Sequence, residues 1–375
     1  MSSEKMLLAP IVPELGSKTH IESKQYSHHL VVHFDINETI LVGDEAGGDT
    51  RNDCLNKMLA KSAFVQIPET GKVSYEETSA IEPTHWWDGT PIKNNGVAPN
   101  RIPPLHIGWQ WPDGCCPYYR TAFKKKSKTF VQHDGSLYQS TYNAIDTLLK
   151  HRGVCELPVL NNMLPAFFET LEQLSRTDQK KTIVLRTMGT DLPDIAQAVT
   201  AFAQGKHKDY PEFHDTNLIL DTESLVKGRW LRNPNGTTVY QLFRGDELVA
   251  AGDQQVLDFI HSHTICGIQD DYPFWHSNGY EPWSGKPVWK LPNALHVLLD
   301  DNIHNLEHDS IACVRQPDAS DPKKFESLTG QEIRQEQCRH LIRVPTIAPI
   351  LHSRWFLEMI DKAQEHFVRW KSEAS

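Results

Sequence analysis

Polar residues that could carry out chemistry follow three short apolar stretches of the chain. They are Asp35, Asn37 and Thr39 after residues 29–34, Thr187 after residues 182–185, and Asp300 and Asp301 after residues 294–299. Short apolar runs of this kind predict buried parallel strands, and ligands bind outside the carboxyl ends of such strands. Carboxylate oxygens suit Mg²⁺, and a strand-end aspartate beside this ion can attack a phosphoryl group to form an aspartyl phosphate. A hydroxyl and a lysine would then hold the transferring oxygens.

Taken in chain order, these motifs resemble those of the haloacid dehalogenase-like hydrolase superfamily. The first family motif, a strand followed by D-x-D-x-[TV], is matched by Phe34-Asp35-Ile36-Asn37-Glu38-Thr39. The second motif is a strand that ends in Thr or Ser, here at Thr187, and the fourth is a strand that ends in an acidic pair, here Asp300-Asp301. The third motif supplies a lysine, for which Lys286 in Gly285-Lys286-Pro287 is the best match. The resemblance covers residues 29–316.

The resemblance implies an Mg²⁺-dependent phosphomonoester hydrolase that acts on a small phosphorylated molecule. Asp35 would be the nucleophile and a metal ligand, the Asn37 backbone carbonyl and Asp300 would be further ligands, Asp301 would act at the metal or through a bound water, and Thr187 and Lys286 would hold the phosphoryl oxygens. Residues 66–160 would be a large cap inserted between the first and second motifs, and its tryptophan-rich loops would shape the substrate pocket.

Asn37 departs from the family pattern. Phosphatases of the family carry an aspartate there, which acts as general acid and base, and an amide cannot take this role at neutral pH. General acid–base catalysis contributes about 10²–10⁴-fold in rate. We therefore expect that the enzyme is slow, that its substrate has a good leaving group, or that another residue acts as the acid. His85, Asp88 and His106 of the cap are candidates for that acid, whereas Glu38 should face away from the site if the chain is extended there. The alternative is a non-catalytic protein that binds metal, ligand or a protein partner.

Other residues compete for these roles. Lys290 rivals Lys286, because only 13 residues separate Lys286 from Asp300, which leaves little room for an intervening helix. Asp270-Asp271 is a second acidic pair after an apolar run, but its strand is weaker and it precedes the lysine. His304 and His308 match H-x-x-E-H, an inverted zinc-peptidase signature, although a helix start is the plainer interpretation. A last cluster, His28, His29 and His33, is expected to pack on strand faces.

The elements that must position these residues alternate between strands and helices. This alternation predicts an α/β fold with a Rossmann-like, mostly parallel sheet flanked by helices and a large inserted cap. The expected domains are an arm at 1–27, an α/β core at 28–65 and 161–375, and the cap at 66–160. We further expect helices at 53–63 (capped by Asp53), 142–151, 161–174, 191–203, 254–261 and 353–370, strands at 129–133, 264–268 and 311–315, and a hairpin around Gly245-Asp246.

Composition restricts the class of protein. The chain has 375 residues, a formal net charge of −10, 39% hydrophobic and 23% charged residues, which is a globular composition. The acidic balance argues against nucleic acid as a partner, and the lack of a long apolar run argues against a membrane span. Seven cysteines without framework spacing, and an N-terminal apolar run broken by Pro10 and Pro13, favour a cytoplasmic protein without a signal peptide. The sequence leaves the oligomeric state open.

Overall fold

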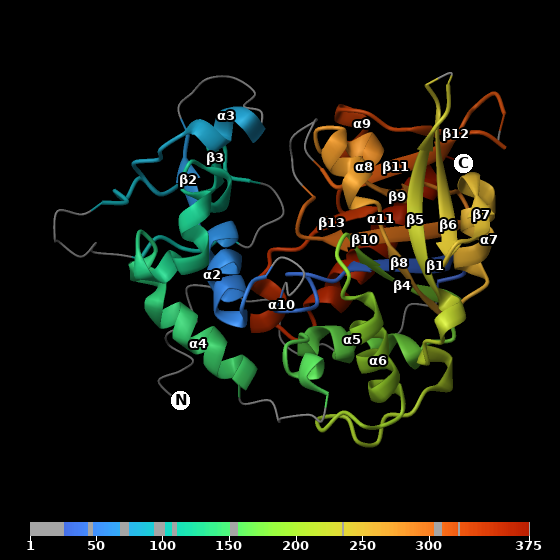
Figure 1. Cartoon of the computed structure of the whole chain (residues 1–375), viewed down its shortest axis with the longest axis horizontal. Helices are drawn as coiled ribbons and strands as arrows, with labels where there is room; N and C mark the ends of the chain where they lie inside the picture. Colours follow the sequence, from blue (N-terminus) through green and yellow to red (C-terminus); the bar gives the residue numbers. More distant parts are fainter. Residues whose placement is uncertain are drawn as a thin grey trace.

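An eight-stranded sheet forms the centre of the molecule (Figure 1). Its order is β13 (Leu341–Arg343), β10 (Ala294–Asp300), β1 (His29–Asp35), β4 (Lys181–Thr187), β8 (Ile265–Gln269), β5 (Leu225–Arg232), β6 (Thr238–Arg244) and β7 (Glu247–Ala251). The strands from β13 to β5 are parallel, and β5, β6 and β7 are antiparallel. The computed structural model describes residues 26–43, 48–67, 75–93, 102–106, 111–150, 157–234, 236–303, 310–321 and 323–374.

Both faces of the sheet are covered, as a parallel sheet requires. Alternate side chains of β1 point to opposite faces, so that Leu30, Val32 and Phe34 belong to one hydrophobic core and Val31 to another. The first face packs against helices α5 (Pro165–Ser175), α6 (Leu192–Ala203) and α11 (Trp355–Ala374). The second face packs against α7 (Gly252–His261) and the small sheet β12 (Phe325–Ser327), β11 (Ala312–Pro317) and β9 (Lys286–Trp289).

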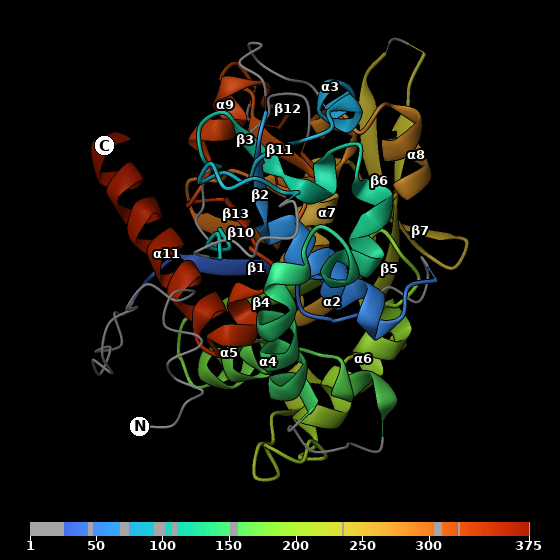
Figure 2. The ribbon, with the colours of Figure 1, turned by 90° about the vertical axis from the view of Figure 1, so that its left-hand side faces the viewer.

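A second group of elements lies beside the sheet, at the left in Figure 1. Its strands and helices are α2 (Arg51–Ser62), β2 (Phe64–Gln66), β3 (Cys115–Pro117), α3 (Tyr75–Ala80), α4 (Gln139–Lys150) and the 3₁₀ segments η1 (Tyr118–Arg120), η2 (Lys124–Gln132) and η3 (Ser136–Tyr138). They enclose a separate hydrophobic core built around Trp86, Tyr118 and Phe130. Figure 2 shows α2 and α4 of this group in front of the sheet.

Short helices complete the chain between the larger elements. They are α8 (Tyr272–Ser277), α9 (Gln331–Gln335), α10 (Ala348–Leu351) and the 3₁₀ segments η4 (Pro158–Asn161), η5 (Thr216–Leu218), η6 (Thr222–Ser224) and η7 (Pro282–Ser284). In the part of the chain that the structure describes, no helix has the length and apolar character needed to cross a membrane.

The prediction of a mostly parallel sheet flanked by helices is confirmed, including the β6–β7 hairpin. The prediction of a strand at 129–133 is wrong. That segment belongs to η2, where the Val131 N–H donates to the Asn56 side chain at 3.0 Å instead of joining a strand ladder. The predicted helix cap is also wrong by one turn, because Thr50 caps α2 and Asp53 completes a capping box from the third position.

Candidate functional site

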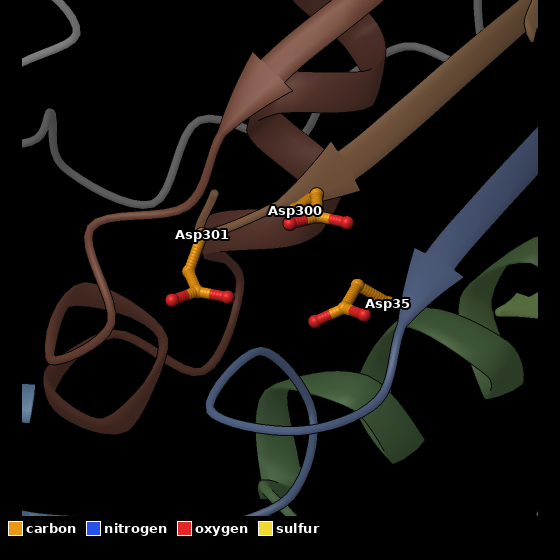
Figure 3. A group of neighbouring side chains, drawn as sticks. All are labelled: Asp35, Asp300 and Asp301. Carbon is orange, nitrogen blue, oxygen red and sulfur yellow. The ribbon is translucent and has the colours of Figure 1, made fainter. Parts of the chain in front are cut away.

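Asp35, Asp300 and Asp301 converge at the carboxyl edge of the sheet (Figure 3). β1 and β10 are parallel neighbours with Phe34 opposite Leu299, which brings their terminal aspartates together. One oxygen of each carboxylate lies within 4.8 Å of an oxygen of the other two, and all three side chains are buried. The local cause is the one expected from sequence: apolar strands end where polar residues begin.

Lys286 bridges two of these carboxylates. Its Nζ donates to Asp35 Oδ1 at 2.5 Å and to Asp300 Oδ2 at 2.7 Å, and the ammonium group is fully buried. Burial lowers the pKa of Lys286, but attraction to Asp300 and Asp35 outweighs this effect and the net pKa is raised. The residue begins strand β9. The rival Lys290 lies elsewhere, paired with Glu336 at 2.9 Å.

Burial destabilises the charged form of two carboxyl groups of the cluster. Burial and the adjacent Asp300 carboxylate raise the pKa of Asp35 well above its usual range, against the opposing effect of Lys286. Burial likewise raises the pKa of Asp301 to about 6, although Lys61 donates to its Oδ2 at 2.5 Å. A carboxylate is stabilised in its charged form by a nearby cation. The cluster therefore has the electrostatics of a site that gains from further positive charge.

Polar groups of the first and second strand ends surround Asp35. The Thr39 hydroxyl donates to Asp35 Oδ2 at 3.0 Å. Thr187, at the end of β4, accepts from the Gly189 N–H at 2.8 Å and lines the same cavity as Asp35 and Asn37. The structure thus brings Asp35, Asn37 and Thr187 together, as the sequence predicts.

Asn37 has a carboxylate partner that the sequence analysis missed. Its Nδ2 donates to Asp191 Oδ2 at 2.9 Å. Asp191 follows Thr187 by four residues, in the loop that leads into α6. Gly189 makes room for this contact, because a Cβ at that position would lie 2.6 Å from Asp191 Oδ2. The only sequence signal was the position of Asp191 in the loop after a strand that already supplied a site residue.

Glu38 does not face away from the site. Its backbone φ is +59°, so the chain turns at this residue instead of continuing as a strand. The carboxylate lines the cavity and accepts ion pairs from Lys57 at 2.5 Å and Lys61 at 2.7 Å. Burial raises the pKa of Glu38, but Lys61 and Lys57 outweigh it and the net pKa is lowered. Both lysines come from α2, so ion pairs connect this helix to the carboxylate side chains of the site.

The competing acidic pair has structural contacts. Asp270 accepts two hydrogen bonds from Arg186, at 2.8 and 2.5 Å, and a third from Tyr240 at 2.6 Å. Asp271 caps α8 and accepts from the Trp230 N–H at 3.0 Å. Both aspartates are buried and neither lines the described cavity at the carboxylate cluster.

The remaining candidates lie apart from the cluster. His29 donates or accepts at Thr182, and His33 contacts His296 at 3.0 Å inside the core, in agreement with strand-face packing. Among the described residues that line the cavity, none is His85, Asp88 or His106. The H-x-x-E-H motif from His304 to His308 lies outside the described residues.

A cavity of about 680 Å³ opens beside the cluster. Its walls come from both cores and from the segment around α8, and they include Asp35, Asn37, Thr187 and Asp301. This volume is in the range of small-molecule sites. The reactive side chains therefore face a space that a small ligand can enter.

The chain was compared with protein-family models, with curated proteins and with solved structures. None of the three comparisons found a match.

Proposed function

We propose that this chain is an Mg²⁺-dependent phosphomonoester hydrolase of the haloacid dehalogenase-like type, acting on a small phosphorylated molecule through a phospho-aspartate at Asp35. One observation carries the proposal. Asp35 stands at the carboxyl end of a central parallel strand, bridged by Lys286 to Asp300 and open to a 680 Å³ cavity. In open α/β sheets this is the edge at which ligands bind.

The donor set fits a hard divalent cation. Asp35, Asp300 and Asp301 offer carboxylate oxygens, and the Asn37 backbone carbonyl is the further ligand that the resemblance implies. Mg²⁺ prefers such oxygens and is commonly held by one or two carboxylates, waters and substrate phosphate. The raised pKa values of Asp35 and Asp301 support a cation here, since burial without one leaves both carboxylates poorly compensated. When bound, the ion would neutralise charge on the phosphoryl oxygens.

The proposed reaction has two displacements at phosphorus. A carboxylate oxygen of Asp35 attacks phosphorus, and the bond from phosphorus to the alcohol oxygen breaks. The leaving oxygen takes its proton from water, because the Asn37 amide cannot supply one. Water then cleaves the aspartyl phosphate, which releases inorganic phosphate and restores the carboxylate. Lys286 favours the ionised form of Asp35, and Thr187 would donate to a phosphoryl oxygen.

The second group of elements would act as the cap. It carries Tyr119, Arg120 and Lys124 to the wall of the cavity that Asp35 also lines. In this proposal the second group of elements selects a small phosphorylated substrate, and neither nucleic acid nor a membrane is a partner. The cap role expected for residues 66–160 is part of the proposal, and α2 (Arg51–Ser62), expected in the core domain, packs with this group.

The second candidate function is a non-catalytic protein that keeps the fold and binds metal, ligand or a protein partner. Asn37 favours it, because the position that supplies a proton in the resembling family here holds an amide bonded to Asp191. The two candidates differ in turnover and not in metal binding.

The test is hydrolysis of a broad phosphomonoester panel with Mg²⁺. We expect activity that EDTA abolishes and that falls at least about 10³-fold in Asp35→Asn, since the nucleophile is lost. Asp246→Asn, an exposed aspartate in the β6–β7 turn, is the matched control and should keep full activity.

Calorimetry with Mg²⁺ separates the two candidates. Mg²⁺ binding without turnover on any substrate would favour the non-catalytic candidate. Turnover that persists in both EDTA and Asp35→Asn would contradict the proposed site.

A further inference from the structure

The cavity beside the carboxylates is lined by more basic than acidic side chains. Its described basic residues are Lys57, Lys61, Arg120, Lys124 and Arg343, and its described acidic residues are Asp35, Glu38 and Asp301. Lys57 and Lys61 form ion pairs with Glu38, and Lys61 also pairs with Asp301. Glu38 and Asp301 are thus matched by two lysines, and the two arginines line the same cavity.

Arg343 supplies this charge from the core. It ends β13 and lies opposite Asp300 in the register of the sheet. Its guanidinium carbon lies 5.9 Å from the centre of the Phe64 ring, so the side chain reaches toward the second group of elements. Burial lowers the pKa of Arg343 to about 10, although Asp301 acts in the opposite direction. Guanidinium groups bind carboxylates and phosphates through charge-assisted, often bidentate hydrogen bonds.

Arg120 supplies charge from the other side. It ends η1, in the second group of elements, and is only 5% exposed. Its guanidinium carbon lies 5.7 Å from the Trp111 ring centre. Lys124 follows at the same wall, with its Nζ 5.2 Å from the Tyr119 ring centre. Arg120 and Arg343 therefore come from different cores and line one cavity.

Aromatic side chains form another part of the same wall. Tyr272, Trp275 and Tyr280 come from α8 and the residues after it. The Trp275 and Tyr280 rings meet edge to face with centres 4.9 Å apart. Tyr280 takes a left-handed backbone conformation, with φ at +63°, to place its ring there. Such a surface suits the apolar or planar body of an organic ligand.

We propose that the substrate carries a second anionic group, a phosphate or a carboxylate, which Arg120 and Arg343 bind while the phosphoryl group to be transferred lies at Asp35. This inference rests on the proposed phosphatase function, and it narrows the substrate class to phosphomonoesters with two anionic ends. Guanidinium groups match the planar, bidentate geometry of both anions.

The test compares substrates that differ only in the second anion. Phenyl phosphate, 4-carboxyphenyl phosphate and 1,4-phenylene bisphosphate are assayed with Mg²⁺, together with propyl phosphate and propane-1,3-diol bisphosphate as flexible counterparts. Wild-type protein should show a KM at least about tenfold lower for the two-anion members of each set, the value expected from one charge-assisted contact. The carboxylate and bisphosphate arms identify which anion is preferred.

Arg120→Gln and Arg343→Gln should each abolish this preference, raising KM for two-anion substrates about tenfold or more and changing kcat/KM for phenyl phosphate less than about threefold. Arg120→Lys and Arg343→Lys keep the charge and should retain part of the preference. Arg232→Gln is the matched control, since Arg232 lies 5.1 Å from the Trp283 ring outside the described cavity lining. Equal losses on one-anion and two-anion substrates would overturn the proposal.

A binding measurement separates this proposal from the phosphatase function. Calorimetry of 1,4-phenylene bisphosphate against Asp35→Asn protein needs no turnover. Binding that depends on Arg120 and Arg343 would support the anion site even if no substrate is hydrolysed. Hydrolysis without any preference for a second anion would leave the phosphatase function standing and overturn the anion site.

Discussion

At the scale of single residues, Asn37 is the position on which the proposed hydrolysis depends most. The structure gives it a contact to Asp191 that no sequence motif required. An amide beside a carboxylate can orient it and cannot itself supply a proton. In the proposed hydrolase, the proton for the leaving alcohol would therefore come from another source, and we expect slow turnover or a substrate with a good leaving group.

Asn37→Asp should raise phosphatase activity. It would place a second carboxyl group within hydrogen-bond distance of Asp191 Oδ2, and two such groups share a proton because both cannot ionise at that separation. The protonated carboxyl could then act as general acid, with a gain in kcat of about 10²-fold for alkyl phosphates and less for 4-nitrophenyl phosphate.

The pH profile of the double variant Asn37→Asp, Asp191→Asn checks the shared proton. Without the second carboxylate, the gain should persist only at lower pH. An unchanged or lower rate in the single variant, with the fold intact by circular dichroism, would count against position 37 as the missing acid.

At the scale of elements, the position of Lys286 depends on how closely strand β9 approaches strand β11. The Lys286 N–H donates to the Ile311 carbonyl at 2.6 Å, and the strands continue in parallel from Lys286 opposite Ala312. Gly285 stands at the closest point, because a Cβ there would lie 2.0 Å from the Ile311 carbonyl oxygen. A short strand thus positions the buried lysine, in keeping with a spacing to Asp300 that leaves little room for an intervening helix.

Gly285→Ala should therefore damage both stability and function. The added methyl group must push β9 from β11, at a cost of about 1–3 kcal/mol in the free energy of unfolding. Since Lys286 is the next residue, kcat should fall by about tenfold or more as its contacts to Asp35 and Asp300 lengthen. Urea unfolding and steady-state kinetics measure the two effects.

Gly43→Ala is the control for this substitution. Its Cβ would meet only Leu41 side-chain atoms at 3.7 and 3.8 Å, an ordinary contact distance. If both glycine variants behave alike, the close approach of β9 and β11 is not what holds Lys286.

At the scale of the whole molecule, ion pairs across one cavity connect the two parts of the structure that carry separate hydrophobic cores. Lys57 and Lys61 of α2 reach Glu38, and Lys61 continues to Asp301 at the sheet edge. Burial in the sheet core also encloses several histidines. His296 contacts His33 and His261, each at 3.0 Å, and accepts at its backbone carbonyl from His340 at 2.7 Å.

These histidines should make the protein sensitive to acid. Burial lowers the pKa of His340 from 6.5 to about 4, so the unfolded chain binds its proton first. The contribution of neutral His340 to the free energy of unfolding is therefore fully present above pH 6.5 and is lost as the pH falls from 6.5 toward 4. For His340 alone, the loss between pH 7.5 and 5.0 is about 2 kcal/mol.

Urea unfolding at both pH values measures this loss. His340→Asn should flatten the dependence by about that amount, whatever its effect at pH 7.5. His366→Asn, an exposed histidine on α11, should leave the slope unchanged. A wild-type protein as stable at pH 5.0 as at pH 7.5 would contradict the prediction.

The sequence by itself determined the strands that end at Asp35, Thr187 and Asp300, because an apolar run that stops at polar residues is a local signal. The parallel alternation of strands and helices then placed these ends at one edge of a sheet. The resemblance added Lys286, whose surroundings in β9 no periodicity indicated.

Only the tertiary structure decided which distant groups meet these residues. The Asn37–Asp191 contact depends on a glycine that leaves space, and the turn at Glu38 depends on a left-handed backbone that two lysines of α2 stabilise. Arg120 and Arg343 line one cavity because two cores pack around it. Such contacts join residues far apart in the chain, and local propensity carries no information about them.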